Sequence, residues 1–235
     1  MAAQKTPELV ALGVYRVDAF AISNAINTLL LENGDGWTLV DTGLASSVKR
    51  IQEALAFLGA GPEDLKRIFI THQHDDHVGG LRGLTGWAPE AEVGASEHEA
   101  AVISGQLPRD LPDNPVFRAL ARNAKSPGVP VGKVLRDGDF VSGFRVIATP
   151  GHSPGHMSLL RDEDGLLFTA DAFGQLWRKL RVGLVKPFCS DPPLTRRSAE
   201  KLLAEDFATV IMAHGPVLRT GAKRTLREAV ARCRY

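Results

Sequence analysis

The densest group of metal-binding side chains in the sequence lies between positions 71 and 77. These residues are Thr71-His72-Gln73-His74-Asp75-Asp76-His77. They follow the apolar run Ile68–Ile70 and precede Gly79 and Gly80, a pattern typical of a buried strand that ends in a loop. Imidazoles and carboxylates are the ligands that zinc and its first-row neighbours prefer, and a tetrahedral ion needs only four ligands. The stretch therefore predicts a metal centre at a strand end, with donors enough for two ions.

Three later loops repeat this arrangement of an apolar run followed by a ligand-type residue. The runs and their residues are Phe144–Ala148 with His152, Leu166–Ala170 with Asp171, and Val210–Ala213 with His214. Of the seven His in the chain, only His98 lies outside these loops and the first one. A His-rich surface tract that scavenges metal would not place its ligands at the ends of separate strands. The repetition favours a shared metal site.

Taken in order, these residues resemble the metallo-β-lactamase-fold superfamily of metallohydrolases. The resemblance rests on His72-x-His74-x-Asp76-His77, then His152, Asp171 and His214, with Asp41-Thr42-Gly43 upstream, and it covers nearly the whole chain. It implies one metal ion on His72, His74 and His152, a second on Asp76, His77 and His214, and Asp171 as the bridge between them.

Two further polar residues belong to the same pattern. The resemblance implies that Asp41 orients the ligands from behind, which fits the need of a ligating His for an outer hydrogen-bond partner. The alternative for Asp41 is an ordinary Asp-Thr-Gly turn at the end of a strand. His156 is the second His of Gly-His-Ser-Pro-Gly-His. The resemblance assigns metal binding to the first, His152, so His156 is interpreted as a packing or supporting residue, with metal binding in place of His152 as the alternative.

The remaining sequence supplies strands and helices that could carry these loops. The Asn33-Gly34-Asp35-Gly36 turn predicts a β-hairpin between Ile26–Leu31 and Trp37–Val40. Other predicted strands are Leu9–Phe20, Ala91–Ala95 and Met157–Leu160. The stretch Lys133–Val141 is predicted to form strands that turn at Asp137-Gly138. Helices are predicted after Ser46 or Ser47, from Val78, from Ser96 to Ile103, around Val116–Leu120, from near Thr195, and from Ala222 to Cys233. Hairpins interrupted by amphipathic helices indicate packed sheets with helices outside, in agreement with the α+β class and the αββα sandwich that the resemblance implies.

The length of 235 residues and the 44% hydrophobic content suit one domain over residues 1–235, with insertions at about 105–131 and 173–193. The first insertion is expected near the mouth of the site, with a disordered loop as the alternative. The second contains Phe173, Trp177 and Phe188, which either line an apolar substrate pocket or form core beneath a long loop.

Charge and composition limit the classes of molecule that the protein is expected to bind. The chain has 28 basic and 27 acidic residues, a net charge of +1, so it offers no field that attracts nucleic acid. No apolar run approaches the roughly 18 residues of a membrane span, and the N-terminus lacks the apolar core of a signal peptide. We therefore expect a cytoplasmic protein that acts on a small molecule without nucleic acid or membrane partners. Cys189 and Cys233 are expected to be free thiols, and the sequence carries no signal for an oligomeric state.

The predicted activity is hydrolysis of an ester, thioester, lactone or related carbonyl bond by a metal-activated hydroxide. A bound divalent ion makes hydroxide available near neutral pH, and a second ion steadies the developing oxyanion. We hypothesise catalytic roles for Asp76, which shuttles a proton while it binds metal, and for Asp171. Two zinc ions are expected, with manganese, iron and cobalt as alternatives because they share such nitrogen and oxygen sites.

The resemblance leaves other classes open. Iron-dependent sulfur dioxygenases of this fold keep the same motif but use one iron on the residues equivalent to His72, His152 and Asp171, and oxygen consumption with a persulfide distinguishes them. A metal-binding module without catalysis is a third class. True β-lactamases of the superfamily lack the bridging Asp, so Asp171 argues against an antibiotic substrate. The well-known lactonases have a Tyr soon after that Asp, whereas Ala172-Phe173-Gly174-Gln175 follows here.

Overall fold

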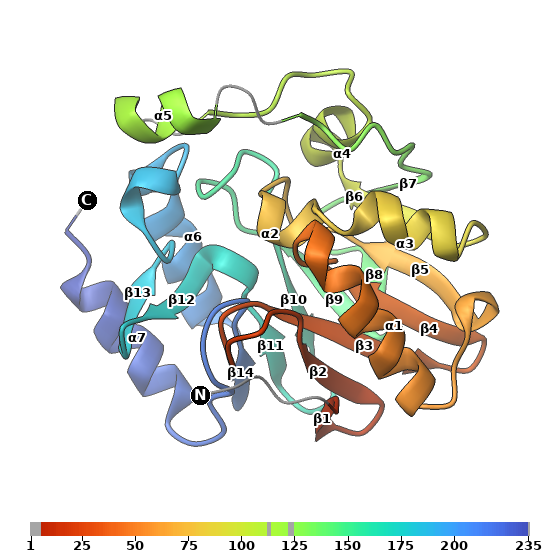
Figure 1. The fold of residues 1–235 in the computed structure, drawn as a ribbon. Helices are drawn as coiled ribbons and strands as arrows, with labels where there is room; N and C mark the ends of the chain where they lie inside the picture. The colour runs from red at the N-terminus through yellow and green to blue at the C-terminus, as the bar shows by residue number, and fades with distance from the viewer. Residues whose placement is uncertain (1–5, 112–113, 122–124, 235) are drawn as a thin grey trace. The chain divides into compact units, whose positions relative to one another are not determined.

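The structure is a computed structural model that describes residues 6–111, 114–121 and 125–234 (Figure 1). The chain divides into two compact units. The first unit comprises Met1–Leu107 and Ser126–Leu135, and the second comprises Pro108–Lys125 and Arg136–Tyr235. Each unit contains a mixed sheet and helices. The expected single domain with two insertions stays a prediction, and the first insertion includes positions 112–113 and 122–124, which lie outside the described residues.

The first unit is built on a seven-stranded sheet whose strands follow one another in chain order. They are β1 (Glu8–Ala11), β2 (Val14–Asp18), β3 (Asn27–Asn33), β4 (Gly36–Val40), β5 (Leu65–Phe69), β6 (Glu92–Ser96) and β7 (Lys133–Leu135). Pairing is antiparallel from β1 to β4 and parallel from β4 to β7. The predicted hairpin is confirmed, with Asn33 opposite Gly36 across the turn between β3 and β4.

Helices of the first unit bury their apolar faces against this sheet. They are α1 (Val48–Phe57), α2 (Asp75–Val78), α3 (Leu81–Trp87) and α4 (Glu97–Ile103), with short 3₁₀ helices η1 (Ala45–Ser47) and η2 (Pro62–Asp64). Ile51 and Leu55 of α1 and Leu84 of α3 share one buried cluster with Leu39 and Ile68 of the sheet. Burial of each such side chain stabilises the folded state by about 1.5–3 kcal/mol. The cluster therefore holds the ends of the strands rigidly in place.

The second unit has a five-stranded sheet in the order β14-β11-β10-β9-β8 and a separate two-stranded hairpin, β12-β13. The strands are β8 (Phe140–Val141), β9 (Phe144–Ala148), β10 (Met157–Arg161), β11 (Leu166–Phe168), β12 (Phe173–Leu176), β13 (Lys179–Val182) and β14 (Thr209–Ile211). The helices are α5 (Pro115–Ala121), α6 (Pro192–Ala204) and α7 (Ala222–Arg232), with η3 (Ala170–Ala172) and η4 (Lys186–Phe188). Leu202 of α6 and Leu226 of α7 share a buried cluster with Leu160, Leu167 and Val210 of the sheet.

Strand direction explains why the predicted ligands of each unit gather at one edge of its sheet. In the first unit β4 and β5 are parallel, so Asp41 and Thr71, which follow them, emerge side by side. In the second unit β11 is parallel to β14, and β10 lies antiparallel to both β9 and β11. The ends of β9, β11 and β14 therefore reach the same edge, where His152, Asp171 and His214 follow.

Several sequence predictions of the elements are corrected by the structure. The expected strand Leu9–Phe20 is a hairpin of β1 and β2, because the chain turns at Gly13, where φ is +67°. The turn expected at Asp137-Gly138 is confirmed, and the strands on its two sides, β7 and β8, pair in different sheets. The helix expected from near Thr195 begins at Pro192, and Asp191 caps it by accepting a hydrogen bond from the Leu194 amide.

The helices around the first ligand loop also differ from their predictions. Ser47 occupies the N-cap position of α1, but its hydroxyl accepts from the backbone of Leu44 in the preceding 3₁₀ turn instead of capping α1. The helix expected from Val78 begins earlier, as the one-turn α2 from Asp75, followed by α3. The cap of α4 is confirmed, since the Ser96 hydroxyl accepts from the Glu99 amide.

Candidate metal centre

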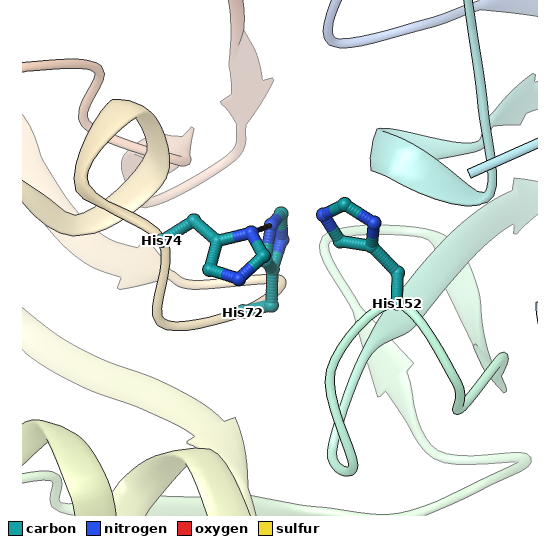
Figure 2. A group of neighbouring side chains, drawn as sticks. All are labelled: His72, His74 and His152. Atoms are coloured by element: carbon teal, nitrogen blue, oxygen red, sulfur yellow. Dashed lines mark hydrogen bonds between the residues drawn. The ribbon is translucent and has the colours of Figure 1, made fainter. Parts of the chain in front are cut away.

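The first group of predicted ligands lies on the loop that follows β5. His72 is buried, and its Nε2 lies 3.1 Å from Nδ1 of His74, so the two rings meet on the same side of the loop (Figure 2). Asp76 and His77 follow on α2, with Asp76 Oδ1 3.9 Å from His77 Nε2. The loop thus brings four donor side chains to one end of the sheet.

Asp41 lies directly beneath this loop and is fully buried. One carboxylate oxygen accepts from the Thr71 amide at 2.8 Å, and the other accepts from Nδ1 of His77 at 2.8 Å. The Thr71 hydroxyl donates to the same carboxylate at 2.8 Å and lies 3.1 Å from Nδ1 of His72. Since the hydroxyl hydrogen is used by Asp41, the hydroxyl accepts from His72 Nδ1. Both histidines are therefore left with Nε2 as the lone-pair nitrogen, the state that a metal ligand requires.

Backbone contacts fix the helix that carries His77. The His77 carbonyl oxygen accepts hydrogen bonds from both the amide and the hydroxyl of Thr42, at 2.7 and 2.8 Å. Gly80 makes this approach possible, because a Cβ at that position would lie 2.4 Å from the Thr42 carbonyl oxygen. The Asp-Thr-Gly segment after β4 therefore packs directly against the segment that contains His77, Gly79 and Gly80.

The second group of predicted ligands surrounds Asp171. The Asp171 carboxylate is buried, with one oxygen 3.2 Å from His152 Nε2 and the other 3.3 Å from His214 Nε2. His152 lies in the turn after β9 (Figure 2), Asp171 lies in η3 after β11, and His214 follows β14. A single carboxylate is thus placed with each of its oxygens against a different histidine.

Close backbone packing holds the His152 turn against the start of α6. Gly151 has φ +125°, and a Cβ on it would lie 2.2 Å from the backbone nitrogen of Thr195. The Gly151 carbonyl accepts from the Asp191 amide at 2.8 Å, and the Ser198 hydroxyl donates to the Pro150 carbonyl at 2.6 Å. Only glycine fits this conformation and this space.

The His156 ring holds the backbone of Asp171 by a hydrogen bond. The Asp171 amide donates to His156 Nε2 at 3.1 Å, so that nitrogen is unprotonated and Nδ1 carries the hydrogen, which it donates to the Thr149 hydroxyl at 2.8 Å. Thr149 in turn lies 3.0 Å from the Ser158 hydroxyl, which donates to the Thr169 carbonyl at 3.1 Å. This buried chain of hydrogen bonds joins the turn that precedes β10 to the turn that follows β11.

The ionisation of His152 reflects its neighbours. Burial by itself lowers the pKa of the imidazole, but hydrogen bonds with Asp171 and with Cys189 outweigh it and raise the pKa to about 9. A cation that binds at Nε2 therefore displaces a proton from this ring.

Sequence reasoning missed some of the residues that support the ligands. Cys189, expected only as a free thiol, is free and fully buried, with Sγ 3.5 Å from Nδ1 of His152. Of the aromatic residues weighed as pocket or core, Phe173 is core, whereas Trp177 is 85% exposed at the tip of the β12-β13 hairpin. No local pattern reveals the Cys189 contact, because the two residues lie far apart in the sequence.

The separations between donor atoms within each unit fit the ligands of a metal ion. Two ligand atoms on one tetrahedral zinc ion, each at about 2.0–2.1 Å, lie roughly 3.3 Å from each other. The His72–His74 pair at 3.1 Å and the two Asp171–His pairs at 3.2 and 3.3 Å match this spacing. Imidazole and carboxylate are also the donor types that zinc, manganese, iron and cobalt share.

Comparison with known proteins decides the family. The profile of the metallo-beta-lactamase superfamily, Lactamase_B, matches residues 23–214. The chain belongs to the metallo-β-lactamase superfamily. An uncharacterized protein of Bacillus subtilis, YobT, is 31% identical over 94% of this chain and 96% of its own length. Membership makes the chain an enzyme of the metallo-β-lactamase-fold hydrolases, a class that uses divalent metal ions and acts on small molecules.

Named relatives and solved structures agree with this family. A probable metallo-hydrolase of Bacillus subtilis, YflN, is 30% identical over 64% of this chain and 61% of that protein. An N-acyl homoserine lactonase of Bacillus cereus is 31% identical over 61% of this chain and 62% of that protein. A metallo-β-lactamase of Cronobacter sakazakii has a TM-score of 0.72 at 23% identity, covering 98% of this chain and 93% of that one.

A subclass B3 metallo-β-lactamase from a soil metagenome library has the same TM-score at 21% identity, covering 98% of this chain and 94% of that one. At these identities the two structures are evidence for the fold alone. They confirm the α+β class and the metallo-β-lactamase fold. Within the described part of the chain, every helix is too short or too polar to cross a bilayer.

Proposed function

We propose that this metallo-β-lactamase-superfamily chain is a dinuclear zinc hydrolase of carbonyl substrates. In this proposal one ion would be held by His72, His74 and His152, and the other by Asp76, His77 and His214. Asp171 would contribute a ligand to both. The proposal rests on membership of the family and on the donor chemistry of the two groups of residues.

The observation that carries the proposal is the placement of Asp171. Its two oxygens face different histidines at 3.2 and 3.3 Å, the spacing expected of paired ligands on two ions. A carboxylate in this position could supply one ligand oxygen beside each imidazole. The backbone hydrogen bond from Asp171 to His156 fixes this orientation.

When bound, the two ions would lower the pKa of a water ligand and polarise a carbonyl group. The protein's own part is to hold the donors in a buried setting, where charge interactions are stronger than in water. Asp76 and His74 are the partly exposed members of the set, and the Asp76 side chain is 32% exposed. Its carboxylate oxygen is therefore placed to take a proton from water and to pass it to the leaving group.

The substrate class follows from the same residues. An ester, thioester or lactone has the carbonyl that such a centre attacks, and one relative is named as a lactonase. True β-lactamases of the superfamily lack an Asp at this place, so Asp171 argues against a β-lactam substrate. Phe173 stands near the position where lactonases of this family have a Tyr, and it is fully buried in the core of its unit.

The test measures metal content per chain by mass spectrometry on protein purified without chelator or added metal. The same samples are assayed against a panel of esters, thioesters and lactones. Asp171→Asn keeps the size of the side chain but removes its charge, and Asp164→Asn, which changes a surface carboxylate of the same unit, is the matched control.

We expect two zinc ions and hydrolysis of at least one class for the wild type and for Asp164→Asn, with loss of an ion and of turnover in Asp171→Asn. Two retained ions and full activity in Asp171→Asn would overturn the dinuclear proposal. A single iron together with oxygen consumption in the presence of a persulfide would replace it with the sulfur dioxygenase class.

A further inference from the structure

The segment between Asp171 and α6 contacts His152 from two sides. The Ser190 amide donates to the His152 carbonyl at 3.1 Å, and Sγ of the neighbouring Cys189 lies 3.5 Å from Nδ1 of the His152 ring. Cys189 is fully buried, so solvent does not compete for this contact. The two consecutive residues hold both the backbone and the ring of His152.

The direction of the hydrogen bonds at Cys189 is decided by its other neighbours. The Sγ atom also lies 3.5 Å from the Gly183 carbonyl oxygen and 3.9 Å from that of Val185. Carbonyl oxygens only accept, so the thiol hydrogen points to this pair. The sulfur lone pairs are then left to accept from Nδ1–H of His152. This arrangement leaves Nε2, which lies 3.2 Å from an Asp171 oxygen, as the ring nitrogen that a metal ion can bind.

We propose that Cys189 is a positioning residue for His152, which sets the tautomer and the orientation of this metal ligand through a thiol acceptor. The proposal rests on the proposed function, in which His152 binds metal. Ligating histidines usually donate their outer N–H to a carboxylate, a backbone carbonyl or water, and loss of that partner typically costs 10–100-fold in metal affinity. Here a sulfur atom, a weak acceptor, takes that place.

Substitutions at Cys189 separate this role from simple packing. Cys189→Ser keeps an acceptor that can also donate to Gly183, but it places a more polar atom in a buried site. Cys189→Val fills the space with apolar atoms but offers no acceptor. Cys233→Ser, which changes the other free cysteine, is the control.

The readout is zinc affinity, measured by competition with a chromophoric chelator, together with the visible spectrum of the cobalt-substituted protein. We expect about 10–100-fold weaker zinc binding and an altered cobalt spectrum in Cys189→Val. Cys189→Ser and Cys233→Ser should stay close to the wild type. If Cys189→Val does not fold, Cys189→Ala removes the same acceptor and takes its place.

Wild-type zinc affinity in Cys189→Val, or equal losses in the Ser and Val variants, would overturn the proposal because it would leave only a packing role. His152→Ala distinguishes this failure from that of the proposed function. If His152→Ala lowers the zinc content while Cys189→Val does not, the positioning role alone is wrong. If His152→Ala keeps the full zinc content, the proposed ligand set is wrong.

Discussion

Asp41→Asn tests whether a buried carboxylate sets the proton position on His77. Asn has nearly the same shape as Asp and tolerates the left-handed backbone at this position, where φ is +60°. The substitution therefore changes the hydrogen bonding without adding backbone strain. Asp41 accepts from the Thr71 amide and from Nδ1 of His77, both at 2.8 Å.

An Asn amide has one accepting oxygen, so one of these two donors must face its NH₂ group. The Thr71 amide cannot change, whereas His77 can move its hydrogen from Nδ1 to Nε2. We therefore expect the amide oxygen to stay with Thr71 and His77 to adopt the tautomer with hydrogen on Nε2, the atom needed for metal binding. Loss of such an outer partner typically costs 10–100-fold in metal affinity, or about 1.4–2.8 kcal/mol.

The assay combines zinc titration against a competing chelator with nitrogen-15 NMR of the His77 ring in the metal-free protein. Asp35→Asn, the same change at an exposed carboxylate of the first unit, should bind zinc like the wild type. The reasoning is refuted if Asp41→Asn binds zinc as tightly as the wild type, or if its His77 ring keeps the hydrogen on Nδ1.

Three further changes test the supports of the second unit. Gly151→Ala, at φ +125° and against the backbone of α6, should lower the free energy of unfolding by at least about 1–3 kcal/mol in a denaturant titration, and a neutral effect would contradict the packing described. His156→Ala leaves the buried Asp171 amide without its acceptor, so we expect a loss of about 1–3 kcal/mol and weaker zinc binding by chelator competition; unchanged zinc affinity would show that the amide contact does not position the carboxylate. The pKa of Asp162 is held below its ordinary value of 3.8 by its hydrogen bond with Arg145, so its contribution to stability is present above that pH and disappears as the pH falls through the lowered pKa. Acid titrations should therefore show wild type and Asp162→Asn converging in stability at low pH, and a difference that grows on acidification would reverse the assigned sign.

The elements that end at the ligands were largely predictable because their signals are local. An apolar run followed by polar and Gly residues predicts a strand that ends in a loop, and β5, β9, β11 and β14 each follow this rule. The Asn33 to Gly36 hairpin was predictable for the same reason. By contrast, the β12-β13 hairpin turns at Trp177 and Arg178, both with positive φ, and such residues give no turn signal in the sequence.

The sequence by itself determined which residues are competent to bind metal, since His and Asp at strand ends are recognisable from chemistry and spacing. Only the tertiary structure decided which nitrogen of each ring carries the lone pair. That choice is made by Asp41, Thr71 and Cys189, whose contacts depend on strand pairing and on the course of a long loop. The Asp41–His77 bond joins residues 36 positions apart, and the Cys189–His152 contact joins residues 37 apart. Hydrogen bonds of a few ångströms between such distant residues leave no periodic trace in the sequence, because the fold alone brings the atoms together.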